Sequence, residues 1–177
     1  HALIVNPHNV SGVGPTLFGG FSFDPLKETT DLWSRFGDAL FYLPKYMLTV
    51  VRGEVYLATN VICRPHDGIS LFAQLHDERR RVLAAAANRP VLRAPAVEEI
   101  VEVDPDEWKE AVGEVVRGLT GSGLEKVVLA RELRLSFADP VQVESVLHNL
   151  LRDHGESFTF AFESGEDCFV GASPERL

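Results

Sequence analysis

The stretch that most restricts the fold is residues 104–120, DPDEWKEAVGEVVRGLT. Asp104 stands where a helix N-cap is expected, and Pro105 follows at the first helical position, where its missing N–H costs nothing. Gly121 is a typical helix stop. The apolar residues between these signals recur every three or four positions: Trp108, Ala111, Val112, Val115, Val116 and Leu119. The segment therefore predicts an amphipathic helix that buries one face against other elements.

Downstream of this helix, the pattern alternates between strand and helix. An apolar run predicts a strand over 124–137, and Asp139-Pro140 opens a second helix that ends at Gly155. Alternating residues over 157–163 and the run 168–173 predict two strands joined by a polar turn. The C-terminal part of the chain is thus predicted to be helix, strand, helix and hairpin.

The upstream half is predicted to be a strand meander followed by a long helix. The Gly19-Gly20 pair indicates a bulge or close backbone packing in the first strand, and Arg52-Gly53 indicates a hairpin turn. Asp67 is expected to cap the helix, and its basic triplet 79–81 is expected to face solvent. The expected elements are strands over 17–24, 39–51 and 54–63, a helix over 68–89, and a short strand within 88–105. This order predicts an α+β fold with a largely antiparallel sheet.

Composition narrows the possible functions. The 177 residues, 45% of them hydrophobic, suffice for one globular domain or part of a larger one, and the net charge of −9 argues against nucleic acid as a partner. Pro44 and Lys45 interrupt the richest apolar run, so no membrane span is expected, and the N-terminus lacks the pattern of a signal peptide. The two cysteines are expected to be buried thiols in a reducing compartment. The six histidines lack zinc-ligand spacing.

Two residues are candidates for acid–base chemistry. Lys126 stands at the head of an apolar run, where partial desolvation would favour a neutral amine that can act as a base. Glu175 follows Pro174 just beyond the last predicted strand, and an apolar pocket there would keep it protonated as a general acid. The alternatives are a lysine that merely flanks a strand and a solvent glutamate paired with Arg176.

The segments that carry these two residues, EKVVLAR (125–131) and FVGASPERL (169–177), resemble the paired signatures of chorismate-utilising enzymes. That family includes isochorismate synthase, salicylate synthase, and the large subunits of anthranilate and aminodeoxychorismate synthases. The resemblance implies part of the chorismate-binding (anthranilate synthase component I-like) fold, with antiparallel sheets and outer helices. It further implies one incomplete domain over 1–177, in which 1–103 is the variable N-terminal part and 104–177 begins the chorismate-binding core, with the C-terminal half missing.

The same resemblance implies a function. Lysine rather than glutamine at position 126 resembles the water-using branch, so Lys126 would activate water for attack at C2 of chorismate, and Glu175 would protonate the departing C4 hydroxyl. We therefore expect a cytoplasmic, Mg²⁺-dependent isochorismate synthase of menaquinone biosynthesis. The Mg²⁺ ligands would lie in the missing half, and no substrate-binding residue or metal ligand is assigned in this chain. The alternatives are a salicylate synthase, a siderophore-type isochorismate synthase, or an inactive structural fragment. A separate polypeptide carrying the C-terminal half is a possible partner.

Overall fold

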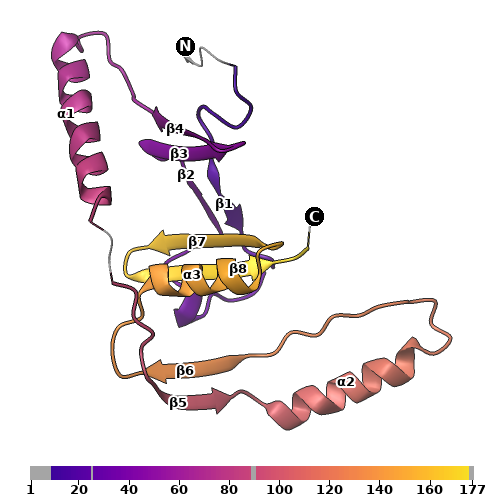
Figure 1. The fold of residues 1–177 in the computed structure, drawn as a ribbon. Helices are drawn as coiled ribbons and strands as arrows, with labels where there is room; N and C mark the ends of the chain where they lie inside the picture. The colour runs from indigo at the N-terminus through magenta and orange to yellow at the C-terminus, as the bar shows by residue number, and fades with distance from the viewer. Residues whose placement is uncertain (1–8, 25, 89–90, 176–177) are drawn as a thin grey trace. The chain divides into compact units, whose positions relative to one another are not determined.

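The computed structural model describes residues 9–24, 26–88 and 91–175. The chain divides into two compact units, one made of residues 1–90 with 162–169 and the other of 91–161 with 170–177. The described strands form four two-stranded sheets, β1–β2, β3–β4, β5–β6 and β7–β8 (Figure 1). None of the helices among the described residues combines the length and the apolar character that crossing a bilayer requires. The elements are β1 (Phe18–Phe21), η1 (Asp31–Trp33), β2 (Ala39–Tyr42), β3 (Tyr46–Val51), β4 (Glu54–Thr59), α1 (Ile69–Ala86), β5 (Val97–Glu102), α2 (Pro105–Leu119), β6 (Leu133–Phe137), α3 (Val143–Asp153), β7 (Phe158–Ser164) and β8 (Asp167–Ser173).

The predicted strand 39–51 is in fact two strands with different partners. β2 pairs antiparallel with β1, and β3 pairs antiparallel with β4. Pro44 separates them because proline has no N–H to donate to a sheet. Its carbonyl instead accepts a hydrogen bond from the Asn60 side chain at 2.7 Å, and the Lys45 carbonyl accepts one from the Asn60 N–H at 2.8 Å.

The two predictions about backbone turns and glycines in this unit are confirmed. Arg52 and Gly53, at the β3–β4 turn, have φ angles of 51° and 82°, as a two-residue hairpin turn with two left-handed residues requires. Gly19 lies against the backbone of β2, where a Cβ would collide with the Leu40 carbonyl oxygen. Close backbone packing therefore explains the glycine at position 19.

α1 starts as predicted within one residue, but its expected cap is wrong. Gly68 is the N-cap, and the Asp67 carboxylate accepts a hydrogen bond from the Arg64 N–H at 2.6 Å, backward along the chain. The Glu78 carboxylate of α1 accepts two hydrogen bonds of 2.7 Å from the Lys45 ammonium, which ties the helix to the residue before β3. The predicted apolar stripe of α1 is largely uncovered, with Ile69 88% exposed.

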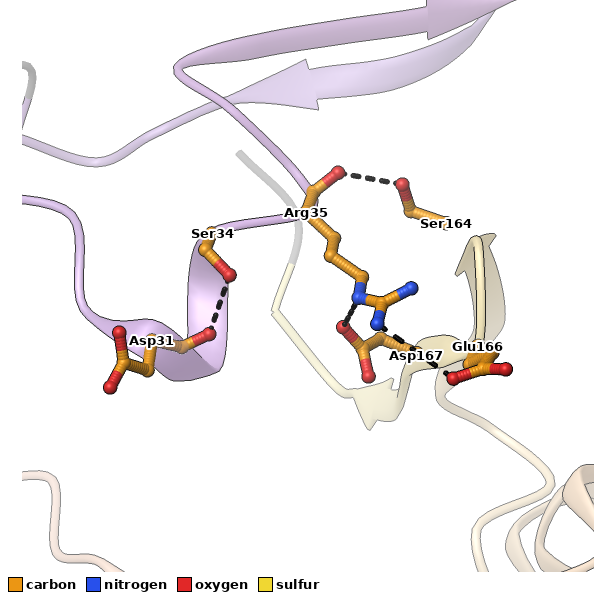
Figure 2. Close-up of polar contacts among 6 residues, drawn as sticks. All are labelled: Asp31, Ser34, Arg35, Ser164, Glu166 and Asp167. Atoms are coloured by element: carbon orange, nitrogen blue, oxygen red, sulfur yellow. Dashed lines mark hydrogen bonds and ion pairs between the residues drawn. The ribbon is translucent and has the colours of Figure 1, made fainter.

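The turn of the β7–β8 hairpin belongs to the first unit, where Arg35 holds it. Figure 2 shows the Arg35 side chain reaching Asp167, at 3.1 Å, and Glu166, at 3.7 Å. The Arg35 carbonyl accepts a hydrogen bond of 2.6 Å from the Ser164 hydroxyl (Figure 2). Trp33, at the end of η1, packs edge-on against Phe169 with ring centroids 5.0 Å apart. The residues around Arg35 and the turn of the β7–β8 hairpin are therefore far apart in the sequence but pack together in the first unit.

In the second unit, β5 pairs antiparallel with β6, with a register irregularity between Val97 and Glu99. α2 has the predicted bounds, although Asp104 has a left-handed φ of 45° and its side chain makes no cap hydrogen bond. α3 begins at Val143, later than Asp139-Pro140 predicted, with Gln142 as N-cap. The Gln142 side chain accepts a hydrogen bond from the Arg93 N–H at 3.0 Å, so these residues connect α3 to the segment before β5.

Burial is sparse throughout the described residues. Met47 and Ser145 alone among them are buried, and many large apolar side chains are exposed, such as Phe21 at 78% and Ile62 at 89%. Much of the apolar surface of the described residues is thus uncovered. The mixture of helices and antiparallel strand pairs agrees with the α+β class. The larger packed sheets and the single domain over 1–177 stay predictions.

Candidate functional site

Lys126 and Glu175, the two sequence-predicted site residues, lie next to each other in the second unit. The Lys126 Nζ is 3.8 Å from Glu175 Oε1. Both side chains are open to solvent, with 74% of Lys126 and 66% of Glu175 exposed. The described structure therefore contains a water-exposed ion pair rather than a desolvated lysine.

Lys126 lies on an irregular segment, and the prediction of a strand beginning at 124 is wrong for its first part. Only 133–137 pair with β5, while 124–132 form the extended connection between α2 and β6 (Figure 1). A strand needs a partner for its backbone groups, and within the described residues this segment has none. Its position is instead set at its two ends.

A tight turn forms the N-terminal end of this segment. Gly121 and Gly123 have φ angles of 81° and 75°, a conformation that favours glycine. The Ser122 hydroxyl donates to the Leu119 carbonyl at 3.1 Å and accepts from the Leu124 N–H at 3.2 Å. At the other end, the Glu132 carbonyl accepts from the Val103 N–H at 3.3 Å. Lys126 is thus carried by a segment that is anchored at both termini.

Glu175 is placed by the end of β8, as predicted. Pro174 follows the strand, and the Glu175 N–H donates to the Ser173 hydroxyl at 3.3 Å. Within the strand, Gly171 leaves room for the Phe160 ring, since a Cβ there would stand 2.8 Å from Phe160 Cζ. The alternative partner Arg176 lies outside the described residues.

A lysine and a glutamate that lie this close together are suited to act as base and acid on one substrate, the two roles of acid–base catalysis. They are also a surface ion pair, which by itself contributes little to stability. A separate hollow of about 600 Å³ is lined by Val10, Glu54, Val55 and Tyr56 and contains neither residue.

The described residues do not fit a metal centre. No group of three or more His, Cys, Asp or Glu side chains among them is arranged to hold an ion. The cysteines are free thiols, and the expectation that both are buried is wrong for Cys63, which is exposed. Burial, followed by the nearby Glu163 charge, raises the pKa of the half-buried Cys168 thiol.

One contact of the segment that carries Lys126 was not foreseen. The guanidinium of Arg131 lies over the indole ring of Trp108 in α2, with 5.8 Å between its Cζ and the ring centroid. The Trp108 Nε1 is buried and has no hydrogen-bond partner among the described residues. The sequence placed Trp108 on a helical stripe and Arg131 at the end of a motif, and no periodicity could join the two.

Comparisons with known proteins give a consistent result. A family model described as "Chorismate binding enzyme" matches residues 1–177. Isochorismate synthase MenF of Bacillus subtilis (strain 168) is 38% identical over 180 residues, which cover 94% of this chain and 35% of that protein. Salicylate biosynthesis isochorismate synthase of Pseudomonas aeruginosa is 32% identical over 172 residues, covering 93% of this chain and 35% of that protein. Isochorismate synthase MenF of Escherichia coli (strain K12) is 36% identical over 76 residues, covering 42% of this chain and 17% of that protein.

The chain therefore spans about a third of the length of the two relatives that match along most of it. No solved structure matches the chain.

Proposed function

This chain belongs to the chorismate-binding enzyme family, and on that premise we propose that it forms part of an isochorismate synthase. The enzyme converts chorismate to isochorismate by adding water at C2 and expelling the C4 hydroxyl. The observation that carries the proposal is the contact between Lys126 and Glu175, 3.8 Å apart although they come from different segments of the chain. It is supported by the similarity to the isochorismate synthases of Bacillus subtilis and Pseudomonas aeruginosa.

The two side chains have opposite roles in the proposed reaction. Neutral Lys126 takes a proton from water as the water oxygen bonds to C2, and the ring double bonds shift. The C4–O bond breaks while Glu175 gives its proton to the leaving hydroxyl, which departs as water. One water is added and one is lost, so the reaction is an isomerisation, and the two residues finish as ammonium and carboxylate. These roles require a site that is closed to solvent, because water would favour the charged forms of both groups.

We propose that the whole protein requires Mg²⁺ for activity. The family resemblance implies this ion, but the described residues contain no group of side chains arranged to hold it. Oxygen-rich sites of carboxylates and water suit Mg²⁺. We place its ligands in a part of the protein beyond residues 1–177.

The pathway is proposed to be menaquinone biosynthesis. Identity with the MenF protein of Bacillus subtilis, 38%, exceeds that with the salicylate-biosynthesis protein of Pseudomonas aeruginosa, 32%. The latter match favours a siderophore or salicylate pathway as the second candidate. The proposed location is the cytoplasm, and the free thiols Cys63 and Cys168 fit a reducing compartment.

The test is chorismate turnover by the protein that contains this sequence, followed by chromatography of the products with and without Mg²⁺. Lys126→Ala and Glu175→Gln should each reduce turnover by about 10²–10⁴-fold, the contribution expected of a general base or acid. Lys109→Ala is the matched control, because Lys109 is likewise an exposed lysine in an ion pair, with Asp106 at 3.1 Å. It should leave turnover unchanged.

The products separate the candidates. Isochorismate alone supports the proposal, whereas fluorescent salicylate would identify a salicylate synthase. A folded protein that leaves chorismate intact with Mg²⁺ present would overturn the proposed activity and favour a non-catalytic role.

A further inference from the structure

We propose that Arg131 is a positioning residue for Lys126, acting by stacking on Trp108 of α2. The role of Lys126 rests on the proposed function, whereas the stacking and its effect on the lysine's position do not. The inference starts from how segment 124–132 is held. Hydrogen bonds of the Leu124 N–H and the Glu132 carbonyl anchor it at its two ends, and within the described residues no sheet ladder supports it between them.

Anchors at the ends leave one motion free. A segment tied at both termini can still turn about its long axis, and this turn changes the direction of every side chain along it. Lys126 would then swing away from Glu175 even though both backbone anchors stay intact. A side-chain contact to a rigid neighbour is what stops the rotation.

The Arg131–Trp108 contact has the geometry for this task. The guanidinium lies within about 6 Å of the ring centroid, the range in which a cation is attracted to an aromatic face. The Trp108 backbone is held in the helix, because its main-chain N–H donates to the Asp104 carbonyl at 3.0 Å in the first turn of α2. This Arg131–Trp108 contact, called the clamp below, thus connects the segment that bears Lys126 to a helix.

The unpaired Trp108 Nε1 indicates which part of the indole matters. A buried N–H without an acceptor is unfavourable, so hydrogen bonding does not account for the tryptophan at this position. The contact of the ring face with Arg131 accounts for it instead. Trp108→Phe keeps an aromatic face and removes the unpaired N–H, whereas Trp108→Leu removes the face.

The first experiment measures turnover of chorismate. Arg131→Ala and Trp108→Leu should each lower kcat about tenfold with KM little changed, because misplacing a reacting group by about 1 Å can cost up to 10²-fold. The double variant should be no worse than either single one. Arg131→Lys and Trp108→Phe should retain most of the activity. Arg134→Ala is the control, since Arg134 is a nearby exposed arginine that pairs with Glu132 instead.

The second experiment does not depend on activity. A water-soluble carbodiimide joins a lysine and a carboxylate that touch, so the native protein should yield a Lys126–Glu175 cross-link detectable by mass spectrometry. Arg131→Ala should reduce its yield several-fold, and Arg134→Ala should not.

The outcomes distinguish the two proposals. If the native protein turns over chorismate and Arg131→Ala changes neither kcat nor the cross-link, the positioning role is wrong while the function stands. If the native protein is inactive but the cross-link depends on Arg131, the function fails and the positioning of Lys126 stands. A cross-link that is equal in all variants refutes the clamp in either case.

Discussion

Replacing the two adjacent glycines of β1 should have opposite effects, although their sequence surroundings are nearly the same. A Cβ at Gly19 would lie 2.7 Å from Phe41 Cα and would collide with the Leu40 carbonyl oxygen. A Cβ at Gly20 meets nothing within 4 Å. Neither glycine has a positive φ, so alanine is compatible with the backbone at both positions. The comparison therefore isolates the steric contact.

The magnitude follows from the distances. Carbon atoms pack at about 3.5–4.0 Å, so Gly19→Ala is roughly 0.8 Å too close to a backbone that cannot rotate away. Relief requires β1 to move off β2 and stretch their hydrogen bonds, at a cost of about 1–3 kcal/mol or more. Gly20→Ala should instead stabilise the strand by about 0.4–1 kcal/mol, because it restricts the unfolded chain.

Hydrogen exchange of the β1 and β2 amides measures the difference where it occurs. Gly19→Ala should lower their protection by at least about fivefold relative to the native protein, since about 1 kcal/mol corresponds to a factor of about five and about 1.4 kcal/mol to a factor of ten. Gly20→Ala should leave protection equal or higher. Equal protection in the two variants would refute the reasoning, because it would mean that β1 and β2 do not approach as closely as the register Gly19↔Phe41 requires.

Two further perturbations test the first unit. Arg35→Ala removes a half-exposed ion pair with Asp167 at 3.1 Å. In denaturant titrations it should destabilise the protein by about 0.5–1 kcal/mol at low salt and by less at 1 M salt, because salt screens the pair. Arg80→Ala is the control at an exposed arginine. A loss that is independent of salt would contradict this. The hydrogen bond from Lys45 lowers the pKa of Glu78. The stability that this ion pair contributes is therefore fully present above the ordinary glutamate pKa, and it is lost as pH falls through the lower pKa of the folded state. The fall in stability on acidification should therefore be smaller in Glu78→Gln, and parallel pH profiles would rule the effect out.

Long-range pairing explains the main errors of the sequence-based prediction. The apolar run 124–132 has the composition of a strand, but a strand forms only where a neighbour satisfies its backbone, and the described residues offer none. The run 39–51 likewise divides at Pro44, and its two parts take different partners. The prediction that Asp67 caps α1 was wrong for a local reason. The Asp67 carboxylate accepts a hydrogen bond from the preceding Arg64 N–H rather than from the helix.

The sequence by itself determined the features that depend on neighbouring residues. The apolar period of α2 and the Arg52-Gly53 turn are written in a few consecutive positions, because helix packing and left-handed φ angles select residues locally. The same holds for the two motifs that identify the family. Only the tertiary structure decided that Lys126 meets Glu175 and that Arg131 stacks on Trp108. Such contacts join residues far apart in the chain, and their geometry depends on how whole elements pack, which no local pattern encodes.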